Sequence, residues 1–300
     1  MQPWAYPVDL AQVQARWQAF VEHRRLDPAL DPLVAVSWER CGRRLNPTLA
    51  PALPCLDPAT LERVRNALAD LIATARPMLE DLYQFTEGSG IAIALFDAAT
   101  CVLDVLGDPM TVQAAEAVGL RPGVYWSEGH VGTNAFALAL LERTPIQVMG
   151  AEHFLLLYHP WTTAAAPIYG LDGQPLGAIG VMGAAERAQP DTLGMVMAAA
   201  RAIEIQMQAA ANLQESHRFL AELQAILEAS DQAVLVLSPQ GQIIRLNRAA
   251  ARILGLDPAG LLGRPVGEHL RLPSTLQAAL ADPQADLESE ATLLVDGTPL

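Results

Sequence analysis

The longest stretch of the chain without proline or glycine begins after Gly194 and includes the whole of residues 195–229. Proline removes a backbone hydrogen bond from a helix and glycine weakens the helix, so their absence favours one continuous helix. We expect this helix to span residues 190–229 and to measure roughly 60 Å. Helices of this length are typical of coiled coils and connectors. The apolar stripe of this helix consists of Leu193, Val196, Met197, Ala200, Ile203, Met207, Ala210, Leu213, Leu220, Leu223 and Leu227.

Residues 1–60 are expected to form a helical N-terminal segment. Apolar side chains recur there every three or four positions, which is typical of amphipathic helices. Asp27-Pro28 and Asp31-Pro32 are expected to start helices, because aspartate caps a first turn and proline is tolerated in it. A further helix is predicted over residues 59–85, which Pro77 should end or kink.

Residues 61–189 combine strand and helix patterns. Apolar runs joined by turns predict β-hairpins over residues 88–108 and 162–184, and Asp172-Gly173 is a strong turn signal in the second hairpin. Helical patterns lie between the two hairpins. The expected fold class is therefore α+β, with an antiparallel sheet domain at 61–189.

Residues 230–300 show strand patterns again. Two strands flank Pro239-Gln240-Gly241, and a final strand is followed by Asp296-Gly297 and the first residues of another strand. A partner strand of two or three residues is too short to pair stably. We therefore expect a second sheet domain over 230–300 that is truncated at its C-terminal end.

Charge and residue usage exclude several function classes. The chain has 33 acidic and 19 basic residues and a formal net charge of −14, which opposes binding to nucleic acid or to an anionic membrane. All 19 basic residues are arginine, so a Walker A phosphate-binding loop and Schiff-base chemistry are absent from these 300 residues.

The remaining composition points to a cytoplasmic chain. Cys41, Cys55 and Cys101 show neither metal-finger nor C-x-x-C spacing, and an odd number of scattered thiols suits a reducing compartment. The N-terminus lacks the pattern of a signal peptide. The apolar runs are too short to span a bilayer.

The stretch 121–168 concentrates the residues that can carry chemistry. One reading is a metal site of Glu128, His130, His153 and His159, although their spacing fits no established metal motif. A second reading is an enzyme in which His130 or His153 acts as a base beside Glu128 or Glu152, but no nucleophile accompanies them.

Two further interpretations of this stretch remain. It forms a binding pocket, or its side chains are purely structural and make their hydrogen bonds within the protein. Aromatic walls with a few polar groups are what small-molecule sites need. Thr133 or Asn134 can cap the helix that follows, and the N-terminus of that helix could receive a polarised ligand group. The expected ligand-binding residues are Trp126, Glu128, His130, Asn134, His153, His159, Trp161 and Thr163.

Three motifs in this stretch carry a family resemblance. They are W-S-E-x-x-x-G-T-N-A from Trp126, G-A-E-H-F from Gly150 and W-T-x-x-A-A-P-I from Trp161. With the S-W-E-R-C segment from Ser37, they resemble the sensor region of acetoin- and dihydroxyacetone-operon regulators, which are sigma-54-dependent bacterial activators. The resemblance implies a GAF-like domain at 61–189, and residues 230–300 resemble a PAS domain.

The resemblance implies a non-enzymatic sensor without a cofactor. Its effector would be a small hydroxyketone or diol, or a regulatory protein, and the signal would pass through a homodimer formed by helix 190–229 to an ATPase and a DNA-binding domain outside these residues. The alternative is a protein-interaction platform with no small ligand. His269 is only a weak haem candidate.

This chain departs from the family pattern at two places. Thr163-Ala164 stand where the family often has Cys-Ser, and Gly180 stands at a position that is often Asp. Both changes are expected to remove polar or thiol groups from the pocket wall.

Overall fold

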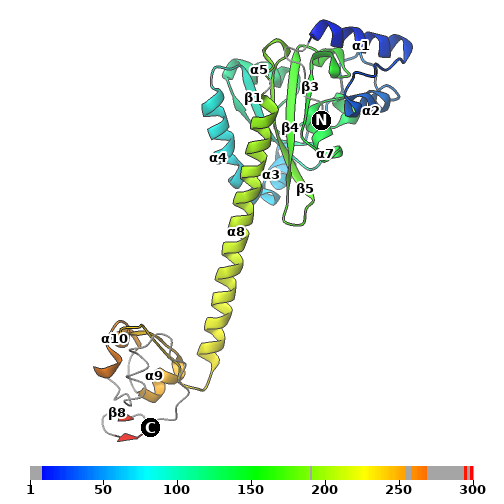
Figure 1. The fold of residues 1–300 in the computed structure, drawn as a ribbon. Helices are drawn as coiled ribbons and strands as arrows, with labels where there is room; N and C mark the ends of the chain where they lie inside the picture. Colours follow the sequence, from blue (N-terminus) through cyan, green and yellow to red (C-terminus); the bar gives the residue numbers. More distant parts are fainter. Residues whose placement is uncertain (1–8, 190, 255–257, 269–293, 296–297, 300) are drawn as a thin grey trace. The chain divides into compact units, whose positions relative to one another are not determined.

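The computed structural model describes residues 9–189, 191–254, 258–268, 294–295 and 298–299. The chain divides into two compact units, Met1–Ala211 and Asn212–Leu300, which are described separately below. The predicted α+β class is confirmed by a mixture of helices with antiparallel sheets (Figure 1). No helix in the described part of the chain combines the length and apolarity needed to cross a bilayer.

A five-stranded antiparallel sheet forms the centre of the first unit, with strand order β2-β1-β5-β4-β3. The two predicted hairpins supply β1 with β2 and β4 with β5, and β1 pairs with β5 to join them. The strands are β1 (Ile91–Asp97), β2 (Val102–Gly107), β3 (Ile146–Met149), β4 (Trp161–Tyr169) and β5 (Pro175–Ala184).

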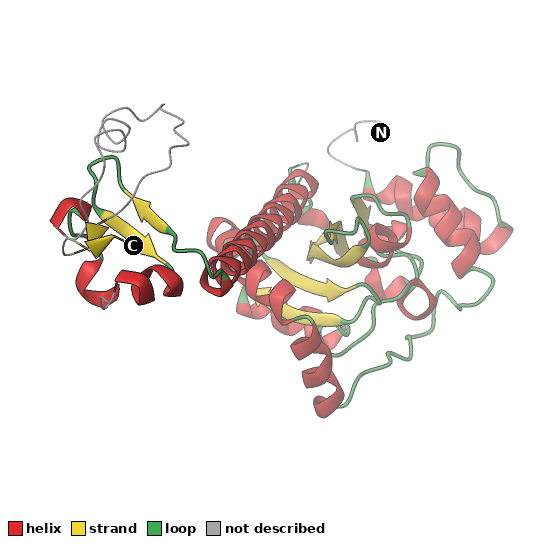
Figure 2. Cartoon of the chain, turned by 90° about the horizontal axis from the view of Figure 1, so that it is seen from below, coloured by secondary structure: helices red, strands yellow, loops and turns green. Residues whose placement is uncertain are grey.

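Both faces of this sheet are buried, because successive side chains of a strand point to opposite sides. In β1, Ala92, Ala94 and Phe96 enter one apolar core, whereas Ile93 and Leu95 enter the other. Helices cover both faces, as the strands (yellow) between helices (red) show in Figure 2. A sheet buried on both sides explains why its strands are continuous apolar runs.

One face packs against α4 (Ala69–Thr86) and the first turns of α8 (Thr192–Ala229). The predicted helix over 59–85 breaks at Leu68, between α3 (Pro58–Ala67) and α4, and Pro77 lies inside α4. Of the two expected effects of Pro77, ending the helix is therefore wrong. The long helix expected over 190–229 is present as α8, 38 residues long.

The other face packs against α5 (Pro109–Ala117), α7 (Ala135–Leu141) and two N-terminal helices, α1 (Leu10–His23) and α2 (Pro32–Cys41). Asp31 caps α2 through Leu33 N, with Pro32 in the first turn, as expected. Asp27-Pro28 instead forms a turn, because Asp27 Oδ1 accepts from Ala29 N and no helix begins at Pro28. The expectation of a helix start there was wrong.

Two indole groups fasten the N-terminal helices to this unit. Trp17 Nε1 donates to Phe154 O at 2.9 Å, and Trp38 Nε1 donates to Glu152 O at 2.7 Å. Trp38 is fully buried and Phe20 stacks obliquely on it, with ring centroids 5.4 Å apart. Helices α1 and α2 therefore contribute to the core of the first unit.

The second unit contains small paired strands and short helices. Asn247 joins its first strands to α8, because Asn247 Nδ2 donates to Leu227 O and Gln232 O. The last strands pair as Leu294 with Pro299 and Val295 with Thr298, so the expectation that the final strand is too short to pair was wrong. The elements are β6 (Leu235–Leu237), β7 (Ile243–Leu246), α9 (Arg248–Leu254), α10 (Pro258–Leu261), η4 (Val266–Glu268), β8 (Leu294–Val295) and β9 (Thr298–Pro299).

Candidate functional site

His153 and Thr163 form the polar centre of the predicted pocket, and both are fully buried. His153 Nδ1 lies 3.0 Å from Gly150 O, and because a carbonyl only accepts, Nδ1 carries the proton. Nε2 is then an acceptor for Thr163 Oγ1, 3.0 Å away. Thr163 Oγ1 in turn accepts from Ala135 N at 3.1 Å. Every polar atom of this pair therefore has a partner within the protein.

Burial also determines the charge of the histidines. Desolvation lowers the pKa of His153 to about 3 and that of His159 to about 4, so both rings are neutral at physiological pH. His159 Nε2 donates to His153 O at 3.2 Å, and its ring meets Trp17 edge-on at 4.6 Å. A buried neutral histidine without a carboxylate partner is a poor general base.

Asn134 caps α7, as one of the two predicted capping residues. Its Oδ1 accepts from Ala137 N at 2.9 Å, while its Nδ2 donates to Trp126 O and Gly132 O. Together with the bond from Ala135 N to Thr163, these contacts occupy N–H groups at the start of α7. That helix start is therefore occupied by the protein's own side chains.

Aromatic rings fill the space between α7 and the sheet. Phe136 stacks on Phe96 with centroids 4.4 Å apart, and it meets Trp126 edge-on at 5.4 Å. Trp126 also contacts Tyr158 at 5.3 Å and donates to Gly119 O. All four rings are fully buried. They form core packing around the predicted pocket residues.

The departures from the family pattern place Thr163 and Gly180 on one face of the sheet and Ala164 on the other. A Cβ atom at Gly180 would lie 2.6 Å from the Phe136 ring, so that ring occupies the space a larger residue would need. Ala164 belongs to the core beneath α4 and α8, opposite Thr163. Thr163 and Gly180 therefore face the side of the sheet on which the predicted pocket residues lie, and only Ala164 faces away from it, because neighbours on a strand face opposite sides.

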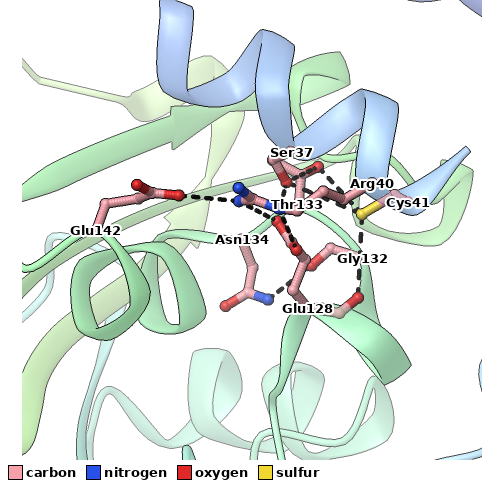
Figure 3. A network of polar contacts seen from close by, with 8 residues as sticks. All are labelled: Ser37, Arg40, Cys41, Glu128, Gly132, Thr133, Asn134 and Glu142. Atoms are coloured by element: carbon pink, nitrogen blue, oxygen red, sulfur yellow. Dashed lines mark hydrogen bonds and ion pairs between the residues drawn. The ribbon is translucent and has the colours of Figure 1, made fainter.

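Glu128 lies apart from this interior, in a network that holds α2 against α6 (Glu128–Val131) (Figure 3). Arg40 grips its carboxylate with two hydrogen bonds, from Nε at 2.7 Å and from Nη2 at 2.8 Å. Ser37 Oγ donates to the same carboxylate, and Arg40 also pairs with Glu142 at 3.0 Å. Such bidentate pairs are among the stronger polar contacts in proteins.

Sequence reasoning missed Ser37 and Arg40 as partners of Glu128. They and Cys41 are separated by three and four positions, which places them on one face of α2. Burial raises the pKa of the Cys41 thiol to about 11, so this thiol stays protonated and unreactive. The spacing within the S-W-E-R-C segment could have identified this face.

The eight predicted site residues thus fall into separate groups. His153, Thr163, Asn134, Trp126 and His159 are linked by hydrogen bonds, directly or through one backbone group. Trp161 is half-buried at the start of β4, Glu128 faces Arg40, and His130 is exposed and bonded to Ser127. Within the described residues, no group of three His, Cys, Asp or Glu side chains could hold a metal. His269 lies outside the described residues.

Two cavities open on the surface of the first unit. One, of about 160 Å³, lies at the end of α2 beside Glu128, and the other, of about 440 Å³, lies beside α5. Neither is lined by His153, Thr163 or Trp161.

The sequence matches two domain families. Residues 70–207 match the GAF domain and residues 221–300 match the PAS fold. With the sheet and helices described above, these matches define the chain as a regulatory region that combines a GAF domain with a PAS fold. The GAF match reaches into α8 because Val196, Ala200 and Ile203 are buried against the sheet.

Curated relatives indicate which regulators the chain resembles. The chain is 29% identical over 263 residues to the PTS-dependent dihydroxyacetone kinase operon regulatory protein of Escherichia coli, which covers 88% of this chain and 41% of the relative. It is 33% identical over 195 residues to the acetoin dehydrogenase operon transcriptional activator AcoR of Bacillus subtilis, covering 64% of this chain and 32% of the relative. The chain is thus homologous to the regulators of dihydroxyacetone and acetoin operons, and it spans about two fifths or less of the length of these two relatives.

A solved structure supports the same assignment. The DhaR(N) chain in the crystal structure of the E. coli DhaR(N)–DhaL complex is 28% identical, with a TM-score of 0.82. The match covers 90% of this chain and 92% of that one. The predicted resemblance to these regulators, with its GAF and PAS domains, is therefore confirmed.

Proposed function

We propose that this chain senses a partner protein through the surface of its GAF unit and passes the signal along α8. The observation that carries the proposal is the filled interior between α7 and the sheet. There the polar groups of His153, Thr163 and Asn134 bind one another or the backbone, and aromatic rings occupy the remaining space. A small effector would have to displace this packing, whereas a docking protein would not.

The relative with a solved structure supports a protein partner. DhaR(N) of E. coli was crystallised with DhaL, and its fold matches nearly the whole of this chain. We propose a partner of the DhaL type for this chain. The other candidate is a small hydroxyketone or diol in a pocket lined by the eight predicted residues, and it is favoured by the family's operon names.

We propose that α8 pairs with a second copy of itself. Between Asn212 and Ala229, most of its large apolar side chains are exposed, at about 60% for Leu213 and Leu220 and 41% for Leu223. Spacings of seven and three residues between them place these leucines on one side of the helix, as in a coiled-coil seam. A long exposed apolar stripe of this kind needs a partner surface.

A chain of polar contacts offers a route from the N-terminal helices to α8. Arg40 on α2 pairs with Glu142 at the end of α7. The next residue, Arg143, accepts from the Tyr169 hydroxyl at 2.7 Å through its carbonyl. Tyr169 N donates to Glu204 Oε1 on α8 at 2.9 Å. A movement of α2 against α7 would thus reach α8 within the first unit.

The experiment compares binding of a DhaL-type protein to wild type and to Thr163→Val by isothermal titration. Thr163→Val removes the hydroxyl that His153 needs at nearly constant volume, at a cost of about 1–3 kcal/mol in unfolding free energy. Docking on the surface predicts equal partner affinity for both folded proteins. The same titration with dihydroxyacetone or acetoin should give no heat of binding. Saturable binding of either compound that Thr163→Val abolishes would establish the interior pocket instead.

A further inference from the structure

An arginine-lined cavity of about 160 Å³ opens where α2 ends, outside the interior discussed above. Figure 3 shows the side chains of Arg40, Cys41 and Glu128 converging between α2 and the segment before α7. The lining residues are Arg40, Cys41, Arg43, Arg44, Leu45, Glu128 and Gly129.

The charge of this cavity is opposite to that of the chain. Three arginines and one glutamate line it, in a protein with a formal net charge of −14. Glu128 does not repel an anion strongly, because Arg40 already binds it through two hydrogen bonds. In the part of the chain that the structure describes, Arg43 and Arg44 are exposed and form no ion pair. Their donors are therefore available to a ligand.

The size and walls of the cavity limit the ligand. A water molecule takes about 30 Å³ of liquid, so the cavity holds the equivalent of about five waters. Sites for drug-sized ligands measure about 300–1,000 Å³, so only a small molecule fits. Guanidinium forks match the geometry of carboxylate and phosphate oxygens. Leu45 adds an apolar wall, and the Cys41 thiol remains uncharged.

We propose that this cavity binds a small organic oxyanion, a carboxylate or phosphate, with its charged head at Arg43 and Arg44 and a short apolar tail against Leu45. The site is distinct from the proposed protein-docking function and does not depend on it. The ligand would lie beside Arg40, whose contacts with Glu128 and Glu142 fasten α2 to the rest of the unit. Binding of the ligand in this cavity would therefore alter how α2 is held against the rest of the unit.

The test is a titration of the full chain with butyrate, acetate and inorganic phosphate at low ionic strength, where surface charges are least screened. The variant Arg43→Gln/Arg44→Gln is compared with Arg63→Gln/Arg65→Gln on α3, which changes the net charge by the same amount. We expect saturable binding of butyrate and phosphate to wild type and to the control, with butyrate tighter than acetate. The cavity variant should lose at least tenfold in affinity.

Three results would overturn the proposal. The first is the absence of saturable binding by all three probes. The second is equal affinity in wild type and the cavity variant. The third is equal loss in both double variants, which would show an effect of net charge alone. Thermal unfolding of both variants controls for folding, and since Arg43, Arg44 and Arg63 are exposed, we expect little change in it.

Discussion

Replacing Gly180 by alanine tests whether the interior of the GAF unit is filled. The added Cβ would lie 2.6 and 2.7 Å from two atoms of the Phe136 ring and 2.8 Å from Ala164 O. The ring cannot easily withdraw, because it is stacked on Phe96 and meets Trp126. Overpacking of this kind costs about 1–3 kcal/mol of unfolding free energy. For a unit of this size, each kcal/mol lowers Tm by about 2–4 °C.

A double-mutant cycle assigns this cost to the ring. Phe136→Leu alone destabilises by less than the about 3–5 kcal/mol typical of a buried Phe→Ala change. In the Phe136→Leu background, Gly180→Ala loses its clash with the ring, while the Ala164 carbonyl contact remains. We therefore expect a coupling energy of about 1 kcal/mol or more, with partial rescue.

Urea unfolding followed by tryptophan fluorescence measures these energies. All five tryptophans lie at or before position 161, so the signal reports on the first unit alone. Gly129→Ala is the matched control, because nothing lies within 4 Å of a Cβ there. It should change stability by no more than about 1 kcal/mol. A neutral Gly180→Ala, or additive effects in the cycle, would refute the account of a filled interior.

Three further predictions concern pH, the route to α8 and pairing. Burial raises the pKa of Glu152 to about 8 from an ordinary value of 4.5, so stability present at low pH is lost as pH rises through that window. In urea titrations, the unfolding free energy of the wild type should fall by about 3 kcal/mol between pH 5 and 7.5, and Glu152→Gln should abolish this fall. The same pH profile in Glu152→Gln and wild type would contradict the prediction. Tyr169→Phe should leave partner affinity intact and remove any partner-induced change in hydrogen exchange of α8; a retained change would exclude this route. Leu220→Asn/Leu223→Asn should shift the chain to monomer in analytical ultracentrifugation, whereas Ala225→Asn on the opposite face should not; equal behaviour would place the dimer contact elsewhere.

The sequence predicted correctly those helices, hairpins and caps that are determined by residues close together in the chain. Apolar runs flanking turns gave the hairpins of the central sheet, and the absence of proline and glycine gave α8. Asn134 was one of the two candidate caps, because a cap needs only the three residues that follow it. The break at Leu68 was missed because no proline or glycine marks it, and the helix instead continues through Pro77.

Contacts between distant segments could not be read from the sequence. Arg40 and Glu128 are 88 positions apart, and no local sequence pattern around either residue indicates that the two pair. The space at Gly180 is set by Phe136, which reaches it only because α7 packs across β4 and β5. Burial likewise decides that His153 is neutral, whereas the sequence left metal, catalytic, binding and structural roles open.

The most direct test of the account is thermal unfolding of the first unit, followed by tryptophan fluorescence, with a DhaL-type protein or with dihydroxyacetone or acetoin. A ligand at about 100 times its Kd adds about 2.7 kcal/mol, a shift of several degrees. We predict a rise in Tm with the protein and none with either small compound. A rise with dihydroxyacetone or acetoin, and none with the protein, would contradict a surface-docking sensor.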